Sequence, residues 1–199
     1  FRPAAGKVAS PYAERSPSLV QSGPGLGKEI AMSDNRKFTL GTDKDVRDYV
    51  PGKDRLCSAT HEEILSGATA DVYLVRTREI LAREGKADTV VTAEIFPSRP
   101  GILAGMPECL HILKGLPVEV WGLDEGAPFE PKDTILRITG PYSAFGIYET
   151  ALLGILASSS AWATRAAECK QAANGLPVIC FGARHIHPAV APVMERAAV

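Results

Sequence analysis

The sequence has few cysteines and no excess of charge of either sign. Its four cysteines, Cys57, Cys109, Cys169 and Cys180, form no CxxC pair and are irregularly spaced. A disulfide framework or a zinc knuckle is therefore not expected, and reduced thiols in the cytosol fit the pattern better. Because 22 basic residues stand against 23 acidic ones, the chain carries no electrostatic signature for nucleic acid or an acidic membrane.

Long apolar runs are also missing. The most apolar stretch, 147–163, contains Glu149 and the Ser158-Ser159-Ser160 run, so no membrane-spanning helix is expected. A composition of 45% hydrophobic and 23% charged residues describes an ordinary globular protein. The 199 residues suffice for one domain, or for one domain and part of another.

The beginning of the chain differs from the rest. It is rich in Pro, Gly and Ser without apolar periodicity, so residues 1–35 are expected to be a disordered or non-native leader. Met32 is a candidate natural start, which would place residues 1–31 outside the natural protein. We expect residues 36–173 to form the first domain with its helices, and residues 174–199 to begin a second.

Two helices are predicted ahead of the first strand. Thr60 and Glu63 have the spacing of a capping box, which predicts a short helix directly after Thr60. A longer helix follows over about 69–84, with Gly85 as its left-handed terminator. Residues 36–59 are expected to be an extended lead-in. The inner face of the longer helix is expected to carry Tyr73, Leu74, Thr77, Ile80 and Leu81.

The remaining elements follow from β-branched runs, helical periodicity and turn signals. They are expected in this order: strand 89–96, helix 107–113, strands 117–123 and 134–138, helices 142–157 and 158–173, buried strand 176–181 and a last helix from Pro188. This order indicates the α+β class, with an α/β sandwich followed by the first β-α unit of an α/β barrel. That barrel would be incomplete, because one strand cannot close it.

Three motifs, taken together, resemble a known family. They are Ala70-Asp71-Val72-Tyr73 with Arg76-Thr77, then GIYETALLG at 146–154 with ATRA at 163–166, and FGARHIHPA at 181–189. In this order and spacing they resemble the nicotinate phosphoribosyltransferases, which are type II phosphoribosyltransferases, over about 45–199. The resemblance implies a quinolinate-phosphoribosyltransferase-like N-terminal sandwich over an irregular barrel. The barrel's later strands would lie beyond Val199, so this chain alone is expected to be inactive.

The resemblance also implies a reaction. The pyridine nitrogen of nicotinate displaces pyrophosphate from C1 of phosphoribosyl pyrophosphate, and nicotinate mononucleotide is formed for NAD salvage. Mg²⁺ accompanies the phosphates, some members couple the reaction to ATP, and the enzyme is a cytoplasmic homodimer or higher homo-oligomer. The chemistry needs an oriented pyridine ring, a cation for its carboxylate, and charge for the phosphates.

Several residues acquire expected roles from this resemblance. Phe181 is implied to stack on the pyridine ring, although a phenylalanine at a strand end also suits a core. Tyr73 is implied to approach the same ring from the neighbouring subunit, or else to belong to the inner face of its helix. Arg184 has a planar fork that suits a carboxylate or phosphate, and it is expected to be catalytic.

His185 stands where the family more often has a second basic residue, and it is expected to assist Arg184 at a phosphate. His187 would share a face with it in an extended segment, but no third ligand is visible, so no metal site is assigned. His187 is a candidate substrate contact, or else it orders the loop before Pro188. The resemblance implies that Thr150 contacts the substrate. It stands where quinolinate enzymes carry an arginine after their glutamate, which favours a substrate with one carboxylate. Arg165 is a candidate contact for phosphate or carboxylate, or an ordinary helix-face arginine.

Three alternatives remain open at this point. Quinolinate or nicotinamide could replace nicotinate as the substrate of the same kind of enzyme. A different class is a carrier or binding module, because residues 124–140 are similar to the barrel-sandwich pattern of biotinyl and lipoyl domains. Such domains present a lysine in a tight hairpin, and Lys132 has the corresponding place without the usual flanking residues.

Overall fold

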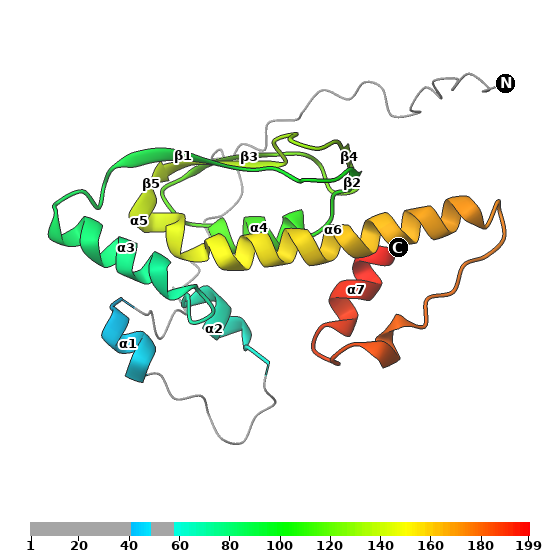
Figure 1. The fold of residues 1–199 in the computed structure, drawn as a ribbon, viewed down its shortest axis with the longest axis horizontal. Helices are drawn as coiled ribbons and strands as arrows, with labels where there is room; N and C mark the ends of the chain where they lie inside the picture. Colours follow the sequence, from blue (N-terminus) through cyan, green and yellow to red (C-terminus); the bar gives the residue numbers. More distant parts are fainter. Residues whose placement is uncertain (1–40, 49–57) are drawn as a thin grey trace, which may run out of the picture.

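A small antiparallel sheet organises the fold. The computed structural model describes residues 41–48 and 58–199. The three strands of the sheet lie side by side in the order β1 (Val90–Ile95), β5 (Leu136–Pro141) and β3 (Glu119–Gly122). A second, two-stranded ladder pairs β2 (Gly101–Ile102) with β4 (Pro128–Phe129). Helices cover one face of the larger sheet, so the fold has a sheet layer and a helix layer (Figure 1).

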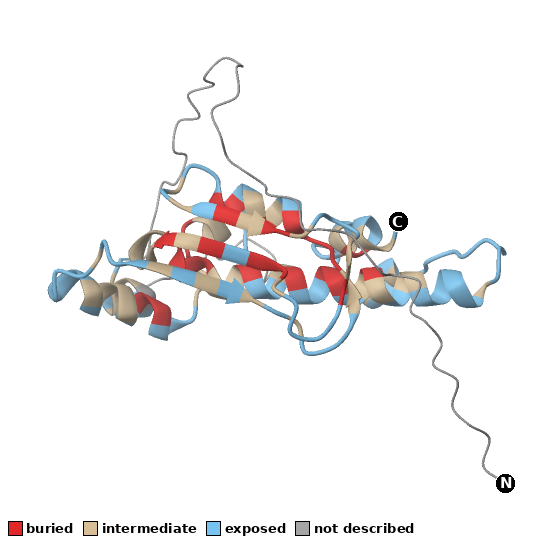
Figure 2. Cartoon of the chain, turned by 90° about the horizontal axis from the view of Figure 1, so that it is seen from above, coloured by how far each residue is buried: buried red, intermediate tan, exposed pale blue. Residues whose placement is uncertain are grey.

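Alternation along the strands explains why one face is covered. In β1, Val91, Ala93 and Ile95 are partly buried, whereas the residues between them are exposed. In β5, Leu136 and Ile138 are buried, and Ala93 lies opposite Ile138. Because side chains alternate across a strand, this pattern leaves the other face of the sheet to solvent, as Figure 2 shows.

Helix α6 (Glu149–Ala172) is the longest element of the helix layer, and α4 (Met106–Leu113) packs beside it. These helices and the sheet enclose one core, whose most deeply buried members include Leu103, Leu136, Cys109 and Leu152. Each fully buried leucine contributes on the order of 1.5–3 kcal/mol to folding. The core therefore lies between the sheet and α6, and it fixes both.

The predicted capping box is present at α2 (His61–Leu65). Glu63 N donates to Thr60 Oγ1 at 3.2 Å, and Thr60 N donates to Glu63 Oε2 at 2.8 Å. The longer helix is α3 (Val72–Arg83), and it ends at Gly85 with φ +65° as expected. The capping signal of α2 and the termination signal of α3 are thus confirmed.

The expectation of an extended lead-in over 36–59 is wrong where the structure describes that segment. Residues Asp43–Asp48 form helix α1. Thr42 and Asp45 make a reciprocal capping arrangement, because Asp45 N donates to Thr42 Oγ1 and Thr42 N donates to Asp45 Oδ2. The Thr42 hydrogen bond is the main cause that lowers the pKa of Asp45. The box has aspartate in place of the usual glutamate or glutamine, which is why the pattern did not reveal it.

The predicted inner face of α3 is only partly correct. Leu74 and Val75 are buried, whereas Tyr73 is 53% exposed and Ile80 is 57% exposed. The helix contacts α5 (Tyr142–Phe145) and the 3₁₀ turn η1 (Gly146–Tyr148) along a narrow stripe beyond the end of the sheet. Because no sheet lies beneath its second half, Ile80 stays in solvent and Leu81 is only partly buried.

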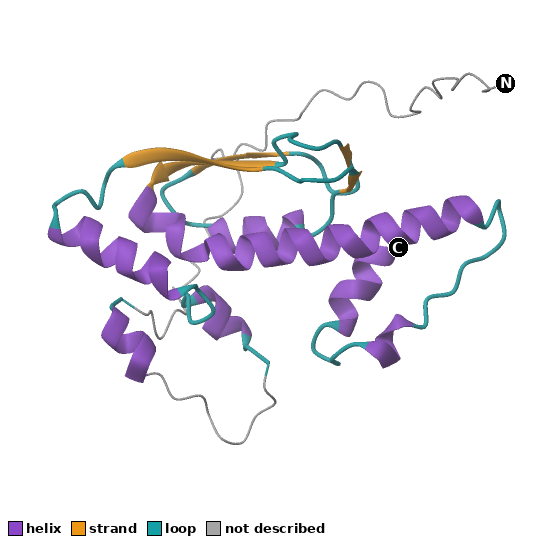
Figure 3. Ribbon diagram, in the orientation of Figure 1, coloured by secondary structure: helices purple, strands orange, loops and turns teal. Residues whose placement is uncertain are grey.

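The two helices expected over 142–157 and 158–173 are instead a short helix, α5, and the continuous helix α6 (Figure 3). The serine run does not break α6. The hydroxyls of Ser158 and Ser160 have partners, whereas the buried Oγ of Ser159 has no hydrogen-bond partner among the described residues. Ser158 Oγ donates to the carbonyl of Gly154 at 2.7 Å, one turn back. Ser160 Oγ bonds to the backbone of Ala104 instead.

The stretch Tyr142–Ala172 is long and apolar enough to cross a membrane when only length and composition are considered. The serine run had led us to expect no such segment. In the structure, 44% of its most apolar window is buried inside the protein, and Leu152 and Leu156 face the core. A core helix of a globular fold has the same properties, so the segment gives little support for a membrane location.

The buried strand predicted over 176–181 is also wrong. These residues form a loop without a strand, and Leu176 and Ile179 are 73% and 74% exposed. A strand needs neighbouring backbone groups, and no strand in the described residues lies beside this segment. The first β-α unit of a barrel is therefore not formed here. The loop leads through the 3₁₀ turn η2 (Gly182–His185) to α7 (Ala191–Ala198), which packs on α6.

Candidate functional site

The N-terminal turns of α3 and α6 bring four polar residues together. Tyr73 Oη donates to Glu149 Oε1 at 3.0 Å. Thr150 Oγ1 donates to Asp71 Oδ2 at 3.0 Å and accepts a hydrogen bond from Asp71 N at 3.0 Å. All these bonds are exposed to solvent, so the group lies at the surface where a ligand can reach it. The residues come from two motifs, and the fold unites them.

The charge of Glu149 affects the two tyrosines near it. The hydrogen bond to Glu149 is the largest of the causes that raise the pKa of Tyr73. Burial, followed by the charge of Glu149, raises the pKa of Tyr142. Both phenols therefore remain protonated at neutral pH, and Tyr73 offers a neutral O–H at the surface.

Phe181 and Arg184 form a second group at η2. The guanidinium carbon of Arg184 lies 5.4 Å from the centre of the Phe181 ring. Both side chains are exposed, and in the described part of the chain no carboxylate pairs with Arg184. The guanidinium lies over the ring, and Phe181 is still 64% exposed, so the pair presents an aromatic surface and a planar cation, which are the two groups that a flat anionic ring requires.

The remaining predicted site residues have less distinctive surroundings. His185 is exposed, and His187 accepts a hydrogen bond at Nδ1 from Ala189 N at 3.2 Å. This contact orders the loop around Pro188. Arg165 pairs with Glu168 at 2.5 Å on the exposed side of α6, as an ordinary helix-face arginine does. The described residues include no cluster of three or more His, Cys, Asp or Glu side chains suited to a metal ion.

One chain does not bring the two groups together. In Figure 1, α3 lies beside the start of α6. The loop after α6 turns back below the second half of that helix, and η2 lies in this loop, next to α7. Helix α6 has 24 residues, and a helix of that length spans about 36 Å. Tyr73 and Thr150 therefore belong to one part of the surface, and Phe181 and Arg184 to another.

Lys132 does lie in a tight turn. Its φ is +71°, Asp133 N donates to the carbonyl of Glu130 at 3.1 Å, and Lys132 N donates to the carbonyl of Pro97 at 2.9 Å. The turn joins β4 to β5, but these two strands pair with other strands and not with each other, so Lys132 does not lie in the tight hairpin of biotinyl and lipoyl domains. These bonds account for the turn as part of the fold, without a need for a modified lysine.

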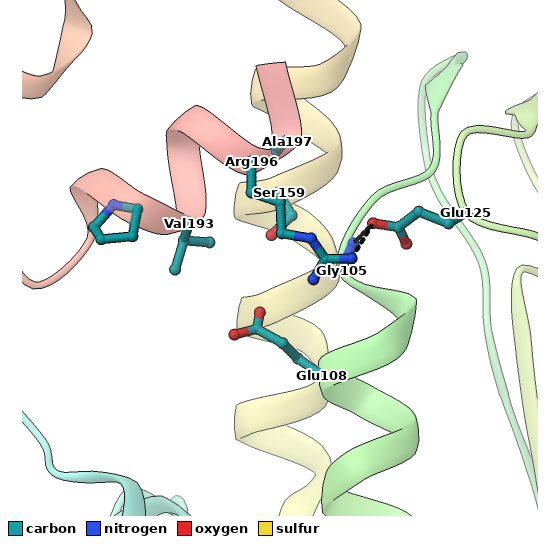
Figure 4. Close-up of a pocket in the computed structure, with 8 residues that line it drawn as sticks. Gly105, Glu108, Glu125, Ser159, Val193, Arg196 and Ala197 are labelled. Carbon is teal, nitrogen blue, oxygen red and sulfur yellow. Dashed lines mark hydrogen bonds and ion pairs between the residues drawn. The ribbon is translucent and has the colours of Figure 1, made fainter. Parts of the chain in front are cut away.

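A small hollow that sequence reasoning missed lies between α4, α6 and α7 (Figure 4). Its volume is about 180 Å³, and Glu108, Ser159 and Arg196 are among the residues that line it. Glu125 also lines it and accepts hydrogen bonds from Gly105 N at 3.1 Å and Met106 N at 2.9 Å, which caps the start of α4. None of the predicted site residues lines this hollow.

Comparison with known proteins shows which protein family the sandwich resembles. Residues 71–160 match the family model described as the quinolinate phosphoribosyl transferase N-terminal domain. These residues include α3, the sheet and the first half of α6. The α+β fold predicted from the order of the elements is thus confirmed as a phosphoribosyltransferase N-terminal sandwich.

Two solved structures are similar to this chain. The chain is 43% identical to nicotinate-nucleotide pyrophosphorylase from Pyrococcus furiosus, with a TM-score of 0.70 over 73% of this chain and 39% of that one. Human nicotinic acid phosphoribosyltransferase shares the fold, at 22% identity and a TM-score of 0.50, over 54% of this chain and 29% of that one. The chain is thus similar in sequence and fold to the Pyrococcus nicotinate-nucleotide pyrophosphorylase, and it spans about two-fifths of the length of that protein.

Proposed function

We propose that this chain is the N-terminal part of a nicotinate phosphoribosyltransferase that acts in NAD biosynthesis. The pyridine nitrogen of nicotinate forms the new bond to C1 of the ribose, and the bond from C1 to pyrophosphate breaks. The products are nicotinate mononucleotide and pyrophosphate. The 43% identity to the Pyrococcus enzyme supports the class of reaction.

The choice of nicotinate as the substrate rests on the pairing of Phe181 with Arg184. Nicotinate is a flat aromatic ring with one carboxylate, and this pair offers a ring face and one planar cation. The neutral O–H of Tyr73 can approach the same ring from a neighbouring subunit. His185 follows Arg184 directly, and we assign it to a phosphate oxygen of phosphoribosyl pyrophosphate.

Mg²⁺ is part of the proposal through the phosphates of phosphoribosyl pyrophosphate, which it would help to neutralise. The described residues form no cluster suited to hold it, so we assign no ligand for it in this chain. Coupling to ATP, a cytoplasmic location and assembly into a homodimer or higher homo-oligomer are further parts of the same proposal.

Quinolinate is the second candidate substrate. The family model that matches residues 71–160 is named for the quinolinate enzymes. Quinolinate carries two carboxylates, and its use requires the loss of one as CO₂. A second cation beside Glu149 would suit that substrate, but Thr150 stands there and its hydroxyl is bonded to Asp71. The surroundings of Glu149 therefore favour nicotinate.

The test uses the complete protein. It is incubated with phosphoribosyl pyrophosphate, Mg²⁺ and, in turn, nicotinate, nicotinamide and quinolinate, with and without ATP, and mononucleotide and pyrophosphate are measured. We expect product from nicotinate. Product from quinolinate with release of CO₂ would show that the substrate is wrong, and no product from any pyridine would reject the function. The 199-residue chain alone is expected to form none.

A matched pair of variants connects the activity to the site. Arg184→Ala removes the exposed cation beside Phe181, and the reaction with nicotinate should fall strongly. Arg83→Ala removes another exposed arginine, which pairs with Glu79 on the outer side of α3. Its activity should stay near that of the unchanged protein, because it lies far from both groups of site residues.

A further inference from the structure

The hydroxyl of Thr150 is already engaged in the structure. It gives its single proton to Asp71 Oδ2 and accepts the N–H of Asp71, both at 3.0 Å. A threonine hydroxyl has one proton to donate. A carboxylate offers only acceptors, so a substrate carboxylate would have to compete with the carboxylate of Asp71 for that proton. The motif alone suggested that Thr150 touches the substrate, and its hydrogen bonds suggest another role.

We propose that Asp71 is a positioning residue of the pyridine site, and that Thr150 acts through Asp71 rather than by contact with the substrate. This inference rests on the proposed function. Asp71 is the N-cap residue of α3, and Tyr73 follows two positions later. Thr150 follows Glu149 at the start of α6. The two Asp71–Thr150 hydrogen bonds, which we call the clamp, join the first turns of both helices.

The clamp explains the geometry of the neighbouring pair. With the helix starts joined, Tyr73 Oη lies 3.0 Å from Glu149 Oε1. That contact keeps the phenol protonated and fixes its direction, in agreement with the raised pKa of Tyr73. Reaction rates depend steeply on such placement, and a shift of about 1 Å can cost on the order of 100-fold. A loosened clamp would therefore disturb Tyr73 without removing any group that touches substrate.

Four single variants of the complete protein separate positioning from contact. Thr150→Val keeps the size of the side chain and removes both hydrogen bonds, whereas Thr150→Ser keeps the hydroxyl. Asp71→Ala removes the acceptor, whereas Asp71→Asn keeps an acceptor oxygen. We expect kcat/KM to fall by about 10-fold in the Val and Ala variants, equally for every pyridine substrate used. The Ser and Asn variants should retain most of the activity.

The double variant Asp71→Ala/Thr150→Val gives a second test. Because both changes break the same clamp, the double variant should lose far less activity than the product of the two single losses. Independent, multiplying losses would overturn the inference. A loss in Thr150→Val that affects nicotinate and spares nicotinamide would also overturn it, because that result means direct contact with the carboxylate.

A readout without substrate keeps this test separate from that of the proposed function. The titration of Tyr73 is followed by NMR of ring-labelled tyrosine and assigned with Tyr73→Phe. The pKa of Tyr73 should be raised in the unchanged protein and in Thr150→Ser, and should return toward its ordinary value in Thr150→Val. An unaltered pKa in Thr150→Val overturns the clamp. If no pyridine reacts but the pKa responds as expected, the function is rejected and the clamp between the helices stands.

Discussion

In the proposed site, Arg184 is the residue that would separate nicotinate from nicotinamide. Its guanidinium lies over Phe181, and a lysine at this position would keep the charge but lose the planar fork. We expect Arg184→Lys to lower kcat/KM for nicotinate by about 10-fold and Arg184→Ala by about 100-fold.

Nicotinamide provides the control for this prediction. It has the same ring and no carboxylate, so any use of it should depend much less on the charge of residue 184. Steady-state kinetics of the three proteins with both substrates measure the difference. Equal losses for nicotinate and nicotinamide in Arg184→Ala would place Arg184 at the phosphates or the ring instead of the carboxylate.

The described thiols differ in a way that predicts their reactivity. Burial raises the pKa of Cys109 to about 12, whereas Cys169 and Cys180 are exposed. A raised pKa means that the thiolate is lost as pH falls through it. At pH 8 the Cys109 thiolate should therefore amount to only about one part in ten thousand.

Alkylation with iodoacetamide at pH 8, followed by peptide mass mapping, checks this prediction. Cys169 and Cys180 should be modified in the folded protein, and Cys109 should react only after denaturant is added. Rapid labelling of Cys109 in the folded protein would contradict the packing of α4 against α6, because Cys109 Sγ faces the carbonyl of Leu152.

At the scale of elements, two hydroxyls of α6 accept hydrogen bonds from the backbone of residues 102–104, which follow β1. Thr164 Oγ1 accepts a hydrogen bond from Ile102 N at 2.9 Å, and Ser160 Oγ accepts one from Ala104 N at 3.1 Å. Ser160 is buried, so its removal would leave a backbone N–H without a partner. We expect Ser160→Ala to lower the free energy of unfolding by about 1–3 kcal/mol.

Ser158→Ala is the matched control, because Ser158 is exposed and its hydroxyl bonds only to its own helix. Its unfolding free energy should change by less than about 0.5 kcal/mol. Urea denaturation of both variants measures the difference. Equal stability of Ser160→Ala and the unchanged protein would mean that water replaces the hydroxyl, and that this bond does not hold the 102–104 segment.

Elements with local signals could be predicted from the sequence. The capping box at Thr60, the terminator Gly85 and the β-branched run of β1 each act through neighbouring residues, and each is confirmed. The strand at 176–181 could not be judged in this way, because a strand depends on partners elsewhere. The serine run misled for a related reason, since Ser160 finds its partner 56 residues away.

In the candidate site, too, contacts between residues close in the sequence could be predicted, and contacts between distant residues could not. Phe181 and Arg184 are three residues apart, so their contact follows from the local chain. Thr150 and Asp71 are separated by 79 residues, and only the folded chain shows that they share two hydrogen bonds. The motifs therefore predict candidate site residues, whereas the partners of those residues in the fold could not be predicted from the sequence.

At the scale of the whole molecule, the separation of the two groups predicts a composite site. Tyr73 is bonded to Glu149 at the start of α6, whereas η2, which carries Arg184, lies below the second half of that helix (Figure 1). If one pyridine ring contacts both groups, they must come from different copies of the chain. A two-fold dimer satisfies this requirement, because each of its two sites then takes one group from each subunit.

Subunit mixing tests this arrangement in the complete protein. Tyr73→Ala and Arg184→Ala should each be nearly inactive alone. In a dimer that contains one of each, one site has both changes and the other site has neither. Random reassembly of equal amounts should therefore restore about a quarter of the unchanged activity. Each variant taken through the same dissociation and reassembly by itself is the control. If the mixture recovers nothing although mixed dimers are detected by mass, then Tyr73 and Arg184 act within one subunit, and α3 and η2 must approach each other there.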